Sequence, residues 1–228
     1  MKVLIGSGRL ASMLLSVLEK DESTYVFGRN EQTVDSLLRQ VDFAKKATVQ
    51  NLSEAKVLFL CLPKEGYNDF FSHYLKLLRK DVTIYHMATA VMKKEVEQFA
   101  GGLRIVPLKL VGHAKVTKAN KAGLFVLPPS CEKEMTHLKR WFPSMKIELT
   151  GEEMALLANQ LGTEAAIKMS MNLTEKMKAH KIPDSLIKQT FDQTVHGVID
   201  AYQANDLGGF AKRIVEQQKK GEDLDEDG

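Results

Sequence analysis

Three small residues close to the N-terminus have the types and the spacing of a phosphate-binding turn. The segment Gly6-Ser7-Gly8-Arg9-Leu10-Ala11 fits the pattern G-x-G-x-x-G/A and directly follows the apolar run Val3–Ile5. In this pattern the first glycine permits a tight turn, the second lets the backbone approach a pyrophosphate, and the last small residue lets a helix pack closely on a strand. Amide groups at the N-terminus of that helix would hold the pyrophosphate. The segment therefore predicts a dinucleotide site to which all six residues contribute.

A second candidate binding segment lies about 20 residues further on, the distance at which dinucleotide sites contact the ribose. The run Tyr25–Gly28 predicts a strand that ends at Gly28-Arg29-Asn30. A site selective for NAD usually places an acidic residue here, whereas a guanidinium can bind a 2′-phosphate with two hydrogen bonds. Arg29 therefore favours NADP(H) over NAD(H), and a solvent-facing arginine at a helix start is the alternative. We expect Asn30 to cap the next helix and to contact the phosphate.

Two later strands predict the other end of the site. The runs Val57–Leu62 and Val82–His86 are apolar and short, and ligands of parallel sheets lie outside the carboxyl ends of the strands. We therefore expect Leu62, Pro63, Met87 and Ala88 to flank the nicotinamide-ribose, with His86 as a further neighbour of the cofactor.

The elements that must position these residues alternate between strands and amphipathic helices, which is typical of βαβ units and a parallel sheet. Helices are expected at Arg9–Glu19, Glu31–Arg39, Tyr67–Leu78, Lys93–Phe99 and Glu132–Trp141. A weak strand is expected near Thr48, and three more, at Leu103–Leu108, Gly123–Leu127 and Lys146–Leu149, are expected to extend the sheet. The predicted fold class is α/β, with a Rossmann-type, doubly wound, mostly parallel sheet in residues 1–149.

The pattern changes at Thr150. Thr150 and Glu153 have the spacing of a capping box before a helix of about 30 residues, longer than the usual helix of a globular protein. A second helix is expected from Asp184 to Gln203 and a third over Phe210–Lys219. Together they predict a smaller all-helical domain at residues 150–220, whose methionine-rich face a region of this size cannot bury alone. We therefore expect a homodimer.

The charge composition narrows the kinds of ligand and partner that we expect. The formal net charge is +3, and residues 221–228 hold five acids and no base, so the chain before them carries +8. This tail is predicted to be disordered, and the basic body suits a small anionic ligand. The lysines are dispersed rather than interleaved with aromatic residues, so we expect no nucleic-acid partner.

The cysteines and the apolar runs point to a location. The two cysteines, Cys61 and Cys131, lack metal-ligand spacing, so no metal site is expected. No apolar run has the length of a membrane span and the first strand leaves no room for a signal peptide. We therefore expect a cytoplasmic protein with no membrane partner.

The glycine segment, the Gly28-Arg29-Asn30 strand end and the apolar run that closes with Pro63 resemble those of pyrroline-5-carboxylate reductase, the β-hydroxyacid dehydrogenases and 6-phosphogluconate dehydrogenase. The layout of a Rossmann domain before a helical domain extends this resemblance over nearly the whole chain. It implies an NADP(H)-dependent reductase or dehydrogenase of a small anionic metabolite.

The resemblance also implies catalytic residues. The hydroxyacid dehydrogenases carry G-x-x-G-x-G-x-x-x-K-x-x-x-N in the interdomain helix, and this chain keeps Gly162, Lys168 and Asn172 but has Asn159 and Glu164 in place of two glycines. Lys168 would act as general acid or base and Asn172 would orient the substrate. The alternative is an ion pair between Glu164 and Lys168, which are also four residues apart.

The resemblance to pyrroline-5-carboxylate reductase implies fewer catalytic residues. Its serine- and glycine-rich substrate motif is missing, and the loop Lys109–His113, where both branches contact substrate, matches neither pattern. His113 is a candidate proton donor there, with a solvated loop histidine as the alternative. Because no catalytic pattern is complete, a non-catalytic, NADP(H)-binding regulatory or cofactor-sensing dimer is the competing hypothesis.

Overall fold

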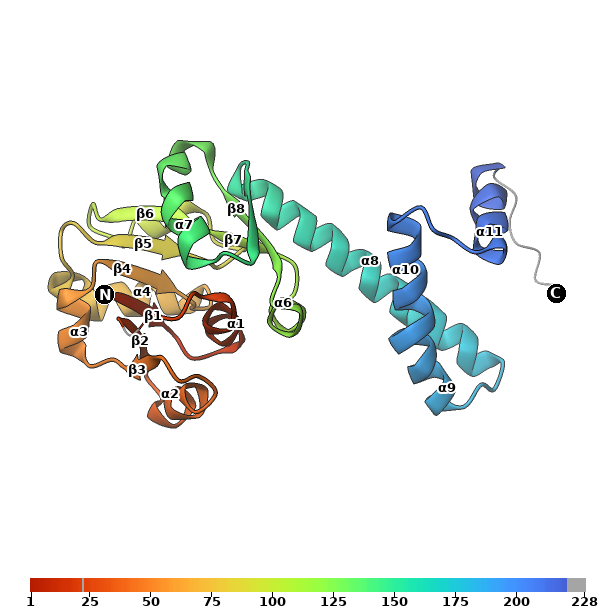
Figure 1. Cartoon of the computed structure of the whole chain (residues 1–228), viewed down its shortest axis with the longest axis horizontal. Helices are drawn as coiled ribbons and strands as arrows, with labels where there is room; N and C mark the ends of the chain where they lie inside the picture. The colour runs from red at the N-terminus through yellow and green to blue at the C-terminus, as the bar shows by residue number, and fades with distance from the viewer. Residues whose placement is uncertain (22, 221–228) are drawn as a thin grey trace. The chain divides into compact units, whose positions relative to one another are not determined.

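The computed structural model describes residues 1–21 and 23–220 (Figure 1). They belong to two compact units, one covering Met1–Thr163 and the other beginning at Glu164. The tail predicted to be disordered, residues 221–228, lies outside the described residues.

Six parallel strands form the main sheet of the first unit, in the order β3-β2-β1-β4-β5-β6. Their bounds are β1 Lys2–Ile5, β2 Thr24–Phe27, β3 Ala44–Lys46, β4 Val57–Leu60, β5 Thr83–His86 and β6 Arg104–Pro107. This is the strand order of the Rossmann fold, so the predicted fold class is confirmed. Ile5 pairs with Phe27 on one side and with Leu60 on the other. The carboxyl ends of β1, β2 and β4 therefore meet at one edge of the sheet.

Both faces of this sheet are buried, as expected for parallel strands. Alternate residues of β4 enter different cores: Phe59 joins the core that holds apolar residues of α1 and α2, whereas Leu58 and Leu60 join the core beneath α4. The helices that connect the strands are α1 Arg9–Val17, α2 Glu31–Leu38, α3 Val49–Glu54, α4 Glu65–Tyr74 with a following turn Leu75–Leu77, and α5 Lys93–Glu97.

Of the three later strands expected to extend the main sheet, the one at Leu103–Leu108 does so as β6, which pairs parallel with β5. The expectation was wrong for the other two. Strands β7 (Lys109–Val111), β8 (Gly123–Leu127) and β9 (Met145–Leu149) form a separate three-stranded sheet. The main sheet ends with β6, whose last residue Pro107 has no N–H to donate, and β7 instead pairs antiparallel with β8. The segment Lys109–His113, predicted as a loop, thus contains a strand. Three further helical segments connect these strands: α6 Ala114–Asn120, the turn η2 Pro129–Glu134 and α7 Met135–Trp141.

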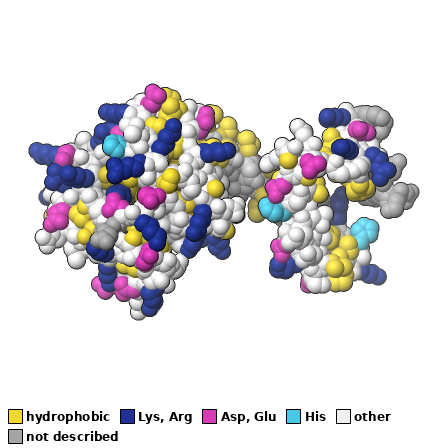
Figure 2. Space-filling view, viewed as in Figure 1, with side chains coloured by type: hydrophobic (Ala, Val, Ile, Leu, Met, Phe, Trp, Pro, Cys, Tyr) yellow, Lys and Arg dark blue, Asp and Glu magenta, His cyan; other side chains and the backbone are white. Residues whose placement is uncertain are grey.

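The long helix predicted after Thr150 is present as α8 (Glu152–Ala179), which begins in the first unit and continues into the second. The second unit adds α9 Asp184–Gln189, a π-helical turn η3 Thr190–Val195, α10 His196–Gln203 and α11 Gly209–Lys220. In the described part of the chain, no helix combines the length and the apolar character that crossing a membrane requires. Lysine and arginine side chains are spread over the visible face of the first unit (Figure 2).

Candidate functional site

The glycine segment forms the turn between β1 and α1. Gly6 has a φ of +106°, and a Cβ added there would lie 2.7 Å from the carbonyl oxygen of Cys61. Its N–H donates a 2.7 Å hydrogen bond to the carbonyl of Phe27. Only glycine fits both this backbone conformation and this spacing, so the turn keeps β1, β2 and β4 closely packed at their carboxyl ends.

Gly8 faces open space and fits a phosphate-bearing ligand. It is the N-cap of α1 and has an ordinary φ of −83°, and no atom lies within 4 Å of where its Cβ would be. The first amide groups of a helix have no partners within the helix and carry a partial positive charge. The first turn of α1 contains no acidic residue, so an anion approaching Gly8 meets amide donors without a competing carboxylate.

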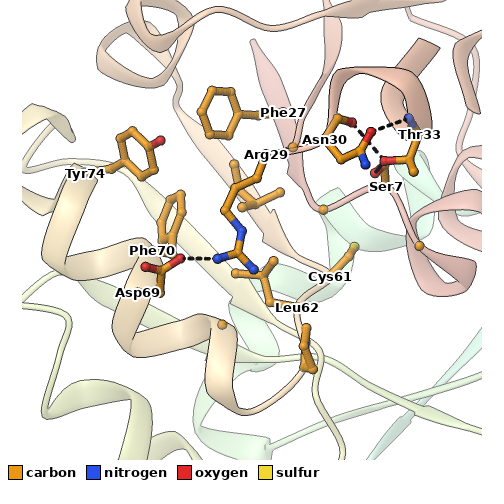
Figure 3. A pocket seen from close by; sticks show the side chains of 16 residues that line it. Ser7, Phe27, Arg29, Asn30, Thr33, Cys61, Leu62, Asp69, Phe70 and Tyr74 are labelled. Carbon is orange, nitrogen blue, oxygen red and sulfur yellow. Dashed lines mark hydrogen bonds and ion pairs between the residues drawn. The ribbon is translucent and has the colours of Figure 1, made fainter.

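A cavity of about 280 Å³ opens at this edge of the sheet (Figure 3). Its lining includes eight of the residues predicted to contact a cofactor: Gly6, Ser7, Gly8, Gly28, Arg29, Asn30, Leu62 and Pro63. These residues come from the glycine turn, the end of β2 and the end of β4. The structure thus brings three segments that are distant in sequence around one space.

One side of the cavity carries a cluster of polar groups. The Asn30 side chain caps α2 by accepting a 3.1 Å hydrogen bond from the Thr33 N–H, as predicted. The Thr33 hydroxyl donates to the Asn30 carbonyl at 2.9 Å and lies 2.6 Å from the Ser7 hydroxyl. Sequence analysis missed Thr33, although its position three residues after a capping asparagine was a usable signal.

Arg29 forms an ion pair that sequence analysis did not predict. Its Nη1 donates to Oδ2 of Asp69 on α4 at 2.8 Å, and the two side chains are 77% and 40% exposed. Figure 3 shows the Arg29 side chain extended toward Asp69. No local pattern could have revealed this carboxylate, because it lies 40 residues further along the chain.

Aromatic rings form another wall of the cavity. The rings of Phe27 and Tyr74 meet edge to face with centroids 5.2 Å apart, and those of Phe70 and Tyr74 are 5.5 Å apart. All three residues line the cavity. An apolar wall beside a polar corner suits a flat heterocyclic base attached to a charged sugar phosphate.

The remaining predicted contact residues do not line this cavity. Ala11 is completely buried, in keeping with close packing of α1 on the sheet, while Leu10 is half-buried and Arg9 is exposed. Met87 is buried in the core and Ala88 is half-buried, directly after β5.

The three candidate catalytic residues are all exposed. Lys168 and Asn172 lie on the part of α8 that belongs to the second unit. Lys168 forms an ion pair with Glu164, the alternative that the spacing had raised. His113 is the N-cap residue of α6, and its side chain makes no capping hydrogen bond. The catalytic roles of these residues stay predictions.

Burial keeps two ionisable groups near the cavity neutral. It raises the pKa of the Cys61 thiol far above its ordinary value. Burial also raises the pKa of Tyr67, whose hydroxyl accepts from the Ala88 N–H at 3.2 Å. Both groups are therefore structural at neutral pH, and Tyr67 fixes the chain directly after β5.

The strand order and the glycine turn at its carboxyl edge define a Rossmann-type fold followed by a helical part. Comparison with solved structures finds the same fold at low sequence identity. A pyrroline-5-carboxylate reductase from Coxiella burnetii has a TM-score of 0.70 and 14% identity, and the match covers 96% of this chain and 90% of that one.

Two other oxidoreductases are similar. An imine reductase from Myxococcus stipitatus in complex with NADP+ has a TM-score of 0.59 and 18% identity, with 90% of this chain and 78% of that one covered. A 3-hydroxyisobutyrate dehydrogenase from Mycobacterium tuberculosis has a TM-score of 0.58 and 13% identity, with 85% and 70% covered. No profile of a known protein family matches the sequence, and no curated protein matches it either. The chain therefore has the fold of these solved structures, as the sequence led us to expect.

Proposed function

We propose that this protein is an NADP(H)-dependent reductase or dehydrogenase of a small anionic metabolite. The observation that carries the proposal is the cavity at the carboxyl edge of the sheet, where the glycine turn, Arg29 and an aromatic wall converge. The imine reductase of the same fold is a complex with NADP+. When bound, this cofactor supplies or accepts a hydride at its nicotinamide ring.

The polar corner of the cavity supports NADP(H) rather than NAD(H). The Arg29 guanidinium and the hydroxyls of Ser7 and Thr33 border the same space, and Asn30 brings the N-terminal amides of α2 to it. These groups are hydrogen-bond donors suited to a phosphate. The adenine would lie against Phe27, Phe70 and Tyr74, and the pyrophosphate against Gly8.

The proposed chemistry assigns one task to each candidate side chain. In reduction, a C=O or C=N carbon accepts the hydride and its heteroatom accepts a proton, so that an alcohol or amine forms. Lys168 or His113 would give that proton, and Asn172 would orient the substrate. The charge of +8 before residue 221 would favour an anionic substrate.

A second candidate function is a non-catalytic, cofactor-sensing dimer. The ion pair between Lys168 and Glu164 favours it, because the lysine expected to move a proton is already paired with a carboxylate. The replacement of two motif glycines by Asn159 and Glu164 points the same way.

Both functions include a homodimer and a cytoplasmic location. Dimerisation is supported by large apolar side chains exposed on the second unit: Met171, Leu186, Val198, Ile199, Tyr202 and Phe210. The reducing cytoplasm is supported by two free, buried cysteines. We assign cofactor binding to residues 1–149 and assembly to residues 150–220.

The decisive experiment replaces Gly8 by alanine and titrates NADPH calorimetrically. The backbone at Gly8 accepts alanine and the new methyl group meets no protein atom, so Gly8→Ala should fold normally yet bind NADPH at least about 10-fold more weakly, since the pyrophosphate must approach this backbone. Gly197→Ala, in the exposed helix α10, is the matched control and should bind as the wild type does.

Turnover then separates the two functions. NADPH oxidation is followed by its absorbance with panels of 2-keto acids and cyclic imino acids. Consumption of NADPH would support the oxidoreductase. Tight NADPH binding without turnover of any panel member would support the cofactor-sensing dimer, and a wild type that binds no NADPH would overturn both.

A further inference from the structure

A cluster of ionisable side chains is buried at the carboxyl edge of the main sheet, outside the cavity. Lys109, the first residue of β7, and His86, the last residue of β5, have completely buried side chains. Glu152, the first residue of α8, is 12% exposed. Burying charges is costly unless they are paired, so the contacts of this cluster show which part of the fold depends on it.

The contacts of Lys109 converge on the backbone that follows β5. Its Nζ donates to the carbonyl oxygens of Ala88 at 2.6 Å and Val91 at 2.7 Å. The same nitrogen lies 3.3 Å from Glu152 Oε2 and 3.2 Å from the His86 ring nitrogens. A lysine ammonium has three donors. Two of them bond the carbonyls and the third faces the His86 ring, while the Glu152 carboxylate acts as counter-charge at ion-pair distance. Lys109 is therefore a positioning residue rather than a proton donor to substrate.

Other groups hold the same segment from the opposite side. The Ala88 N–H donates to the Tyr67 hydroxyl at 3.2 Å, so side chains hold both polar groups of Ala88. Glu152 Oε1 accepts from the Lys93 N–H at 2.7 Å, and Glu95 accepts from the Met92 N–H at 2.8 Å. The chain from Met87 to Lys93 is thus fixed by side chains from α4, α5, β7 and α8.

This segment contains Met87 and Ala88, which we expected from the sequence to flank the nicotinamide-ribose because they follow β5 at the ligand-binding edge. We propose that Lys109 and Glu152 hold the Met87–Lys93 segment in the conformation that binds the nicotinamide-ribose. The adenosine half binds at the other end of the site, at Arg29 and Asn30, and does not depend on them. This inference rests on the proposed function.

The protonation states of the cluster provide a second way to test this proposal. Burial lowers the pKa of Lys109 to about 8, and the charges of Glu152 and Glu95 oppose this shift. Burial likewise lowers the pKa of His86. Burial acts to raise the pKa of Glu152, but His86, the Lys93 N–H and Lys109 together outweigh it and lower that pKa. Near neutral pH, Lys109 is therefore charged, Glu152 is ionised and His86 is neutral.

Stability and positioning respond to pH in opposite directions. The pKa of Lys109 is about 8 in the native protein and about 10.4, the value of an unperturbed lysine, in the unfolded chain. Between these two pH values the unfolded chain therefore binds more protons at Lys109 than the native protein does. This group therefore makes the free energy of unfolding rise with pH in that window. The uncharged amine is a weaker donor to the carbonyls of Ala88 and Val91, so the segment is held less firmly. If Lys109 only stabilised the fold, its deprotonation would not weaken nicotinamide binding at a pH where the protein becomes more stable.

The experiment compares two probes by calorimetry: NADPH, and adenosine 2′,5′-bisphosphate, which contains only the adenosine half. Lys109→Met keeps the length of the side chain and removes its donors. We expect NADPH to bind about 10-fold more weakly to this variant and the bisphosphate to bind unchanged. Lys2→Met is the matched control, since Lys2 is also buried and paired with a carboxylate, Asp21, but lies at the amino end of β1. It should leave the ratio of the two affinities unchanged.

Each outcome of this experiment supports or overturns the proposed role of Lys109. Unchanged NADPH affinity in Lys109→Met, or equal weakening of both probes, would overturn the inference. Should Lys109→Met fail to fold, the wild type alone gives the answer: the affinity ratio of NADPH to bisphosphate should fall between pH 7 and 9.5, and a constant ratio would overturn it. A wild type that binds neither probe would instead overturn the proposed function, which distinguishes the two failures.

Discussion

The Arg29 guanidinium at the end of β2 and the Asp69 carboxylate on α4 are joined by a 2.8 Å hydrogen bond. The cation expected to recognise a 2′-phosphate is therefore paired with an anion before any ligand arrives. Because the Arg29 side chain is largely exposed and that of Asp69 is partly exposed, such a pair contributes little to stability, about 0 to 1 kcal/mol. An arriving phosphate can displace the carboxylate at small cost, whereas a ribose 2′-hydroxyl could use the same carboxylate as an acceptor.

Removing the cation should remove the preference for the phosphate. Arg29→Ala should weaken NADPH binding by about 10- to 100-fold, because a hydrogen bond to a charged group contributes about 1.5 to 3 kcal/mol. NADH binding should barely change. Calorimetric titration of both cofactors measures this, with Arg39→Ala, an exposed residue that does not line the cavity, as control. Equal affinity of the wild type for NADH and NADPH would contradict the assignment.

Removing the anion should act in the opposite direction. Asp69→Asn keeps the size of the side chain but no longer competes with the phosphate for Arg29 or repels it. We expect NADPH to bind several-fold, about 3- to 10-fold, more tightly, in keeping with a coupling of about 1 kcal/mol. The double variant Arg29→Ala/Asp69→Asn should lose this gain. If Asp69→Asn tightens NADPH equally with and without Arg29, the carboxylate acts by repulsion alone.

The buried carboxylate of Glu134, which bonds side chains of β5 and β6, provides a test of stability. The Tyr85 hydroxyl donates to Glu134 Oε2 at 2.7 Å, and Arg104 pairs with the other oxygen. Tyr85→Phe leaves one buried oxygen without its donor, which should lower the free energy of unfolding by about 1 to 3 kcal/mol. Urea unfolding measures the difference. Tyr74→Phe, at a half-buried tyrosine whose hydroxyl bonds none of the described residues, is the control and should change nothing measurable when no ligand is bound.

Assembly is tested on the second unit. Ile199 and Tyr202 on α10 are 45% and 60% exposed, and we expect a second copy of the chain to cover them. The wild type should scatter light as a dimer at micromolar concentration, and Ile199→Glu should weaken association, with Gln203→Glu as the control on the same helix. A monomeric wild type would contradict the expected dimer.

The Rossmann sheet and the glycine turn could be predicted because each is encoded locally. The glycine turn lies between an apolar run and an amphipathic run, and its small residues are Gly6, Gly8 and Ala11. The spacing between successive apolar runs then predicts where the carboxyl ends of the strands meet. The same reasoning placed eight predicted residues around one cavity.

The rest depends on pairings that no local pattern encodes. The separate sheet of β7, β8 and β9 follows from an antiparallel pairing after Pro107, which periodicity cannot distinguish from extension of the first sheet. Asp69 reaches Arg29 across 40 residues. Lys109 looked like a loop lysine because charged residues are rarely buried. Its burial is tolerable because Glu152, from a distant helix, and the carbonyls of Ala88 and Val91 are its partners.

Because Cys61 is buried, the rate at which its thiol is alkylated reports local opening next to the glycine turn. Its carbonyl oxygen would lie 2.7 Å from a Cβ at Gly6, and the raised pKa leaves almost no thiolate to react with an alkylating reagent. Alkylation therefore needs a local opening of the cavity wall, to which Cys61 belongs. A bound dinucleotide that spans this turn should slow the labelling of Cys61 in proportion to its occupancy, so the rate of a single covalent reaction would report ligand binding without any knowledge of the substrate.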